Sequence, residues 1–126
     1  MLTVYIAGPY TNGDCAANTG DAICVFGRLA EMGVCPICPH TSILIQIIAP
    51  QRWERWIDFG LEMVRRSDCV LRMAGDSRGA DIEVSEAVSL GIPVFRECGQ
   101  WLEFCEWVET QQRQDAEPAT GMDGNG

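Results

Sequence analysis

The segment from Ser77 to Glu83, Ser-Arg-Gly-Ala-Asp-Ile-Glu, combines residue types that could carry out a displacement reaction. A serine and a glycine stand where a helix is expected to begin, and the free backbone N–H groups of a helix start form a site for an anion such as phosphate. Glu83 would project from the first turns, where the helix end favours an ionised carboxylate. A fixed carboxylate beside a phosphate cradle is suited to attack on C1′ of a sugar. The alternative is an ordinary capping serine and a solvated glutamate, since capping boxes are common.

A second candidate segment, Tyr5-Ile6-Ala7-Gly8-Pro9-Tyr10, spans the end of an apolar run that is typical of a buried strand. Gly8 and Pro9 would let a ligand approach the backbone, and Tyr5 offers a hydroxyl group and a ring face. Taken alone, the segment is better explained as a packed strand end that binds nothing.

Cysteine and histidine do not form a recognisable metal or redox motif. Cys35-Pro36-Ile37-Cys38 has the C-x-x-C spacing of redox sites, but those stand at a helix start, whereas this segment is expected to be a strand. A zinc site that included His40, the only histidine, would need a fourth ligand that no second cluster supplies. We therefore expect no metal and no organic cofactor, and we expect His40 to hydrogen-bond within its loop or to contact a ligand.

The elements that would position these residues alternate between strand and helix. Strands are expected over residues 2–7, 34–38, 68–73 and 92–95, and helices over 14–32, 51–66, 79–90 and 100–112, with a short helix or lid over 41–50. This alternation predicts an α/β fold, a flavodoxin- or Rossmann-like three-layer sandwich around a parallel sheet of four to five strands. Ligands of such sheets bind beyond the carboxyl ends of the strands, which is where both candidate segments would lie.

Length and charge limit the partners. The 126 residues suffice for one domain, expected over residues 1–112 and followed by a small, polar, disordered tail over 113–126. All nine basic residues are Arg, which removes mechanisms that need a lysine, and the net charge of −9 would repel nucleic acids. No apolar run is long enough to span a membrane, and the N-terminus lacks the basic region of a signal peptide, so we expect a cytoplasmic protein.

Residues 2–96 resemble the nucleoside 2-deoxyribosyltransferase superfamily, especially its small uncharacterised bacterial and phage members. The resemblance rests on Tyr-Ile-Ala-Gly-Pro-Tyr at the first strand, on Ser-Asp-Cys-Val-Leu-Arg at the third, and on the stretch from Ser77 to Phe95. Its most specific part is S-x-G-x-x-x-E followed by A-x-x-x-G-x-P-V.

This resemblance implies roles for the candidate residues. Glu83 would be the nucleophile that forms a glycosyl-enzyme, and Tyr5 would help to position Glu83 and the sugar. The residue at position 77 would contact the 5′ end of the substrate: the nucleoside transferases carry Asp there, whereas the nucleoside 5′-monophosphate hydrolases carry Ser, as this chain does. The expected substrate contacts are therefore Ser77, Arg78 and Gly79, together with Gly8, Pro9 and His40.

One position departs from the superfamily pattern. Members usually have an acidic residue that contacts the base eight positions before the third-strand Asp, and here that position is Gly60. Asp58 and Glu62 flank Gly60, but each lies roughly 160° around a helix from it, given 100° per residue. Either the helix start bends to present Asp58 as the catalytic acid, or the proton comes from elsewhere, with candidates His40, Asp76 and Asp81.

These observations predict cleavage of an N-glycosidic bond, or base exchange, on a small nucleoside or nucleoside 5′-monophosphate, with Glu83 attacking C1′. The alternative is a non-catalytic nucleotide-binding module that has kept the phosphate cradle and lost the base-side acid. Gly60 favours the binding module, and the intact S-x-G-x-x-x-E motif favours the enzyme. The tryptophan-rich helix over 51–66 and the small sheet, together with the resemblance, also predict a homo-oligomer.

Overall fold

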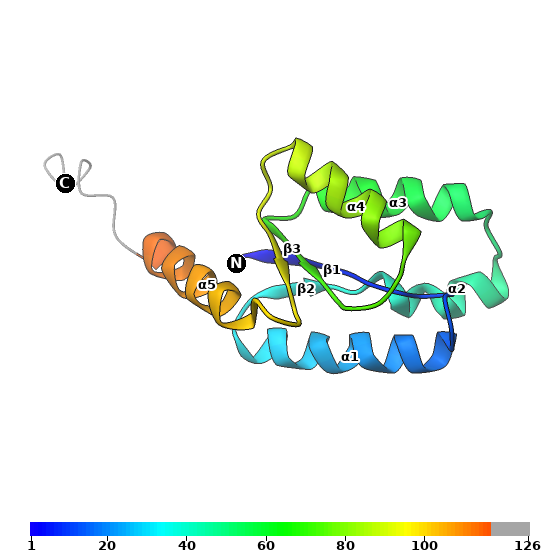
Figure 1. Cartoon of the computed structure of the whole chain (residues 1–126), viewed down its shortest axis with the longest axis horizontal. Coiled ribbons are helices and arrows are strands. Elements are labelled where there is room, and N and C mark those ends of the chain that lie inside the picture. The colour runs from blue at the N-terminus through cyan, green and yellow to red at the C-terminus, as the bar shows by residue number, and fades with distance from the viewer. Residues whose placement is uncertain (117–126) are drawn as a thin grey trace, which may run out of the picture.

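Four short strands form one parallel sheet at the centre of the molecule (Figure 1). The computed structural model describes residues 1–116, and its strands are β1 (Thr3–Ala7), β2 (Cys35–Ile37), β3 (Cys69–Arg72) and β4 (Val94–Arg96). They pair in the order β2-β1-β3-β4. The central strands β1 and β3 are largely apolar because helices cover both faces of the sheet. The predicted α/β class with a parallel, Rossmann-like sheet is thereby confirmed.

Helices follow the strands, and short signals at their ends set their length. They are α1 (Cys15–Glu31), the 3-10 helix η1 (Pro39–Ser42), α2 (Ile43–Ile48), α3 (Trp53–Arg65), α4 (Arg78–Ser89) and α5 (Trp101–Ala116). Asp14 caps α1 by accepting hydrogen bonds from the backbone N–H groups of Ala16 and Ala17. Gly33 and Gly91, with φ of 77° and 73°, take the left-handed conformation that ends α1 and α4 and turns the chain toward the next strand.

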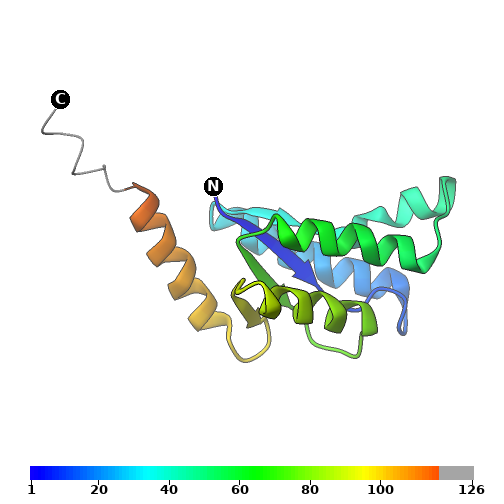
Figure 2. The same cartoon turned by 90° about the horizontal axis from the view of Figure 1, so that it is seen from above.

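Two hydrophobic clusters, one on each face of the sheet, hold the helices in place and make three layers. α1 and α5 pack on one face, and α3 and α4 lie side by side on the other (Figures 1 and 2). Alternate residues of β1 contribute to the two clusters: Val4 and Ile6 to the first, Tyr5 and Ala7 to the second. The strand period therefore places Tyr5 on the face that α3 and α4 cover.

The element boundaries agree with the prediction to within two residues, except at the end of the last helix. The short helix expected over residues 41–50 is present as α2, which follows η1 directly, and none of the α2 residues is buried. The last helix, expected to end at residue 112, continues to Ala116, so the first part of the predicted disordered tail is helical. The remainder of that predicted tail, residues 117–126, lies outside the described residues.

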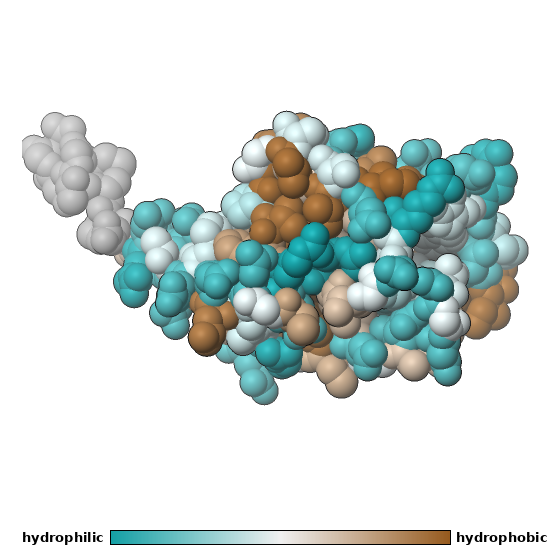
Figure 3. All heavy atoms as spheres, viewed as in Figure 1, coloured by the Kyte–Doolittle hydropathy of each residue, from teal (hydrophilic) through white to brown (hydrophobic). Residues whose placement is uncertain are grey.

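Exposed apolar side chains gather over α4 and at the end of the molecule formed by α2 (Figure 3). The exposed apolar side chains of α2 are Leu44, Ile45, Ile47 and Ile48, and Ile48 is 82% exposed. None of the described helices combines the length and the hydropathy that crossing a bilayer requires.

Candidate functional site

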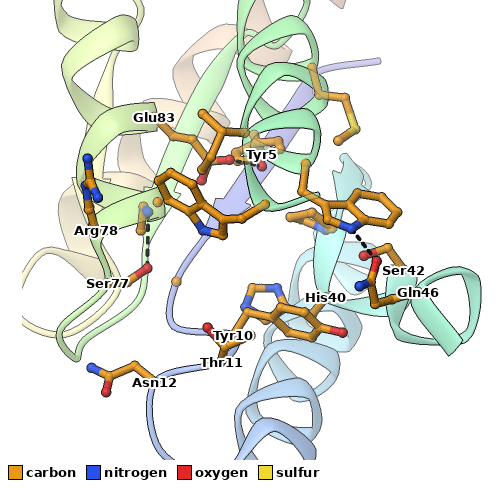
Figure 4. Close-up of a pocket in the computed structure, with 18 of the residues that line it drawn as sticks. Tyr5, Tyr10, Thr11, Asn12, His40, Ser42, Gln46, Ser77, Arg78 and Glu83 are labelled. Carbon is orange, nitrogen blue, oxygen red and sulfur yellow. Dashed lines mark hydrogen bonds between the residues drawn. The ribbon is translucent and has the colours of Figure 1, made fainter. Parts of the chain in front are cut away.

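A cavity of about 550 Å³ lies beyond the carboxyl ends of β1 and β3 (Figure 4). Its walls come from the loop after β1, from η1 and α2, from one side of α3, and from the β3–α4 loop with the first turns of α4. Figure 4 shows Tyr5 and Glu83 between two ends of this cavity: Ser77 and Arg78 lie toward one end, and Ser42 and Gln46 toward the other. The two segments predicted from the sequence thus meet at the carboxyl edge of the sheet, as parallel α/β folds require.

Tyr5 and Glu83 form the central pair of the site. The Tyr5 hydroxyl donates a hydrogen bond of 2.5 Å to Oε2 of Glu83. Tyr5 is fully buried on the α3–α4 face of the sheet, and Glu83 shares the buried side of α4 with Ala80 and Ala87. The strand alternation and the helix period therefore direct the two side chains to one point, although 78 positions separate them in the sequence.

Burial dominates the electrostatics of Glu83. It raises the pKa of the carboxyl from 4.5 to about 7, although the hydrogen bond from Tyr5 and the positive charge of Arg72 both lower it. The sequence predicts that the helix start favours the ionised carboxylate, whereas the pKa is shifted in the opposite direction. Glu83 lies beyond the first turn of α4, where the field of the helix end has faded, and its carboxyl is buried.

Gly60 of α3 makes room for the Glu83 carboxyl. A Cβ atom added at residue 60 would overlap with Oε2 of Glu83 and would lie 3.0 Å from the Tyr5 hydroxyl oxygen. α3 therefore packs bare backbone against the Tyr5–Glu83 pair. An acidic side chain at residue 60 does not fit while that pair keeps its place.

The start of α4 forms the end of the cavity that suits an anion. Ser77 is the N-cap, and its Oγ accepts a hydrogen bond of 3.1 Å from the backbone N–H of Ala80. The capping interpretation of Ser77 is thus confirmed, but capping uses one N–H and leaves the first-turn groups of Arg78 and Gly79 without an intrahelical acceptor. The guanidinium carbon of Arg78 lies 5.1 Å from the centre of the Trp53 ring, so both side chains stand at this end.

His40, Gly8 and Pro9 meet around the loop after β1, but only two of them line the cavity. His40 is buried, and its Nε2 lies 2.9 Å from the Pro9 carbonyl oxygen, a contact that fits an N–H donor. Burial lowers the pKa of His40, which favours the neutral ring. Gly8 lines the cavity, and a Cβ there would lie only 2.9 Å from Cβ of Met73. Pro9, predicted to contact substrate, is outside the lining, and its carbonyl oxygen contacts His40.

The predicted acid Asp58 is not at the site. Asp58 is exposed on α3 and does not line the cavity. α3 is a continuous helix, so no bend turns Asp58 toward the side occupied by Gly60. Of the substitutes, Asp81 is exposed and pairs with Arg72 at 3.0 Å, outside the lining. Asp76 does line the cavity, as an exposed residue of the β3–α4 loop beside Ser77.

Gln46 is a cavity residue that sequence reasoning missed. Its Oε1 accepts hydrogen bonds from the Trp56 indole N–H at 2.6 Å and from the Gln51 backbone N–H at 3.0 Å. Its Nε2 donates to the Gln51 carbonyl at 3.3 Å. The sequence does contain one indication of its role: Gln46 is the single polar residue in the apolar helix Ile43–Ile48.

Comparison with protein families gives one finding. Residues 2–97 match the family model described as a domain of unknown function (DUF7768). The matched range includes all four strands and every cavity-lining residue. No curated protein matches the chain.

Proposed function

Because the chain belongs to the DUF7768 family, whose description names no activity, we propose from the site itself that this protein cleaves the N-glycosidic bond of a small nucleoside 5′-monophosphate. The observation that carries the proposal is the buried Glu83 carboxyl, held by Tyr5 in a cavity that has a helix start at one end and aromatic side chains around it. The resemblance to the nucleoside 2-deoxyribosyltransferase superfamily supports the same chemistry.

In the proposed reaction, Glu83 attacks C1′ of the sugar and the base leaves, which forms a glycosyl ester on the enzyme. Water then resolves the ester in hydrolysis, or a second base resolves it in base exchange. Tyr5 keeps one carboxylate oxygen fixed, and burial and the nearby carboxylate raise the pKa of Tyr5, so it stays a donor throughout. Incubation with nucleosides and 5′-monophosphates, with and without a second base, tests the proposal by measuring released or exchanged base.

A second candidate function is nucleotide binding without catalysis. Gly60 favours it, because the side chain that contacts the base in the superfamily is replaced here by bare backbone. Under this alternative, a nucleoside 5′-monophosphate binds measurably in calorimetry but releases no base over hours. Base release that is lost in Glu83→Gln would show that the protein is an enzyme and not only a nucleotide-binding module.

Ser77→Asp is expected to remove the preference for 5′-monophosphates. Asp is a good N-cap, so α4 should still begin at the same residue. Its carboxylate, however, would repel a phosphate at the first-turn N–H groups and cost about 1 kcal/mol or more. The ratio of kcat/KM for a 5′-monophosphate to that for its free nucleoside should fall about fivefold or more.

Ser85→Asp is the matched control for this change, because Ser85 is exposed on the same helix and outside the cavity lining. Its ratio should equal that of the unchanged protein. An unchanged protein that handles free nucleosides as well as 5′-monophosphates would contradict the assignment of this end to phosphate.

Base release should rise with pH through about 7. Only the ionised carboxylate can attack C1′, and the pKa of Glu83 is about 7, so below that pH the protonated form dominates and kcat/KM falls about tenfold per pH unit. The phosphate of the substrate also titrates near pH 6, and Tyr5→Phe separates the two groups. Losing the Tyr5 hydrogen bond raises the pKa of Glu83 further, so the rising limb should move to higher pH. If the rising part of the pH profile stays at the same pH in Tyr5→Phe, the titrating group is the substrate phosphate.

We propose, finally, that the protein is a homo-oligomer in which a second copy covers α2. The apolar side chains exposed on α2 lie next to Ser42 and Gln46 of the cavity wall, and Phe59 and Trp53 are partly exposed on α3. Light scattering at micromolar concentration should give a multiple of the chain mass, and Ile48→Asp should shift it toward the monomer. Leu102→Asp, at an exposed leucine of α5, is the control and should leave the mass unchanged.

A further inference from the structure

The charged groups of the cavity gather away from the end where a base would lie. Among the described residues, those lining the cavity carry two carboxyl groups, on Glu83 and Asp76, and one guanidinium, on Arg78. Asp76 and Arg78 flank Ser77 at the start of α4. With the 5′-phosphate at that start and C1′ beside Glu83, the base would extend toward Ser42 and Gln46 (Figure 4).

Among residues 1–116, the side chains at this base end offer no strong acid. His40 directs its Nε2 to the Pro9 carbonyl, and burial lowers its pKa. The amide of Gln46 is already engaged with Trp56 and Gln51. Burial is also the main cause that raises the pKa of the Tyr10 hydroxyl. The remaining polar side chains here are the weakly acidic hydroxyl of Ser42 and the amide of Gln51, whose Nε2 donates to the Ala49 carbonyl at 3.2 Å.

α3 does not supply the missing proton donor either. Where an acid could face the base, α3 presents Gly60, and Glu83 and Tyr5 occupy the space that a side chain would need. Asp58 lies on the exposed side of the helix. The lack of a base-side acid is thus built into the packing of α3 against α4 rather than left to the conformation of one side chain.

A neutral purine or pyrimidine leaves as an anion unless an acid protonates it, and a positioned acid contributes about 10²–10⁴-fold to such a step. An N-glycoside of a positively charged heterocycle has no such need. When its C1′–N bond breaks, the bonding electrons neutralise the ring, which departs as an uncharged molecule.

We propose that this site acts on nucleoside 5′-monophosphates whose base is a cationic N-heterocycle, of the pyridinium or N7-alkylpurinium type. This inference rests on the proposed function. A Glu83 oxygen forms a bond to C1′ while the C1′–N bond breaks and its electron pair returns to the ring. Water then attacks C1′, the ester bond breaks to restore the carboxylate, and the water proton passes to solvent through the cavity mouth.

The surroundings suit a positive ring. The rings of Tyr10 and Trp56 line the base end, and aromatic faces attract a cation as well as stack on it. The net charge of −9 also favours a cationic group over an anionic one in the approach to the cavity. The 5′-phosphate would be held apart from this ring, at the start of α4 beside Arg78.

The test compares two matched pairs of compounds by chromatography of the released base. 7-Methylguanosine 5′-monophosphate and guanosine 5′-monophosphate differ by one methyl group and one charge, and both are used with ribose and with 2′-deoxyribose. Nicotinamide mononucleotide and its reduced form have nearly the same shape, but only the first has a cationic ring. Glu83→Gln gives the background for each compound, including spontaneous loss of 7-methylguanine.

We expect base release above background at least about 100-fold faster for the cationic member of a pair than for its neutral partner. Equal rates within both pairs would overturn the inference and leave the proposed function standing. Release from neither member of either pair above the Glu83→Gln background, with the common neutral 5′-monophosphates equally inert, would overturn both.

Discussion

Glu83→Gln is expected to lower base release by at least about a thousandfold, because an amide cannot form the glycosyl ester on which the proposed reaction depends. Gln keeps the shape of the side chain and an oxygen that can accept the hydrogen bond from Tyr5. The cavity should therefore persist, and the affinity for a nucleoside 5′-monophosphate should change little. Initial rates of base release and calorimetric binding, on the same preparation, separate the two effects. A Gln variant that retains activity would end the covalent mechanism.

The free energy of unfolding of the same variant should depend on pH differently from that of the unchanged protein, because Glu83 is buried and can be charged. The folded-state pKa of Glu83 lies above its ordinary value of 4.5, at about 7. The stability that this group contributes is therefore fully present below pH 4.5 and is lost as pH rises through 7. Gln has no such dependence. Glu83→Gln should thus be more stable than the unchanged protein at pH 8, by on the order of 1–3 kcal/mol, and this advantage should vanish near pH 4.5. Denaturant unfolding at both pH values measures the difference.

Gly60→Ala should reduce activity about 100-fold or more while the protein stays folded. The new Cβ would overlap with Oε2 of Glu83, so the carboxyl must leave its position against Tyr5. A displacement of about 1 Å at a reacting group can cost 10²-fold in rate. Ala also favours a helix interior over Gly by about 1 kcal/mol, which opposes unfolding. The pH profile should shift together with the rate, because Glu83 loses the hydrogen bond that lowers its pKa.

Gly27→Ala is the matched control, since Gly27 lies within α1 and a Cβ there meets nothing within 4 Å. It should raise the free energy of unfolding slightly and leave the rate and the pH profile unchanged. A Gly60→Ala protein with normal rate and pH profile would show that Glu83 does not need the space against α3.

Much of the architecture could be predicted from local sequence. The apolar run at residues 2–7 and the glycines at 33 and 91 act within a few residues of their own position, so β1 and the ends of α1 and α4 were foreseeable. Ser77 likewise caps α4 through a hydrogen bond to Ala80, three positions away. Once strands and helices alternate, the parallel sheet and its carboxyl edge follow, and with them the side on which Tyr5, Ser77 and Glu83 had to appear.

The chemistry at that edge depends on distances between helices and strands, and these distances cannot be predicted from the order of the elements along the chain. In the sequence, Gly60 stands where an acidic residue is expected. In the structure, α3 approaches α4 so closely that the Glu83 carboxyl occupies the space that a side chain at residue 60 would need. The helix start argued for an ionised Glu83, whereas packing buries the carboxyl and raises its pKa to about 7. Asp58 was adjacent in sequence and faces solvent. Local signals specify backbone conformation, but ionisation and close contact arise from which surfaces exclude water from one another, and only assembly of the layers brings those surfaces together.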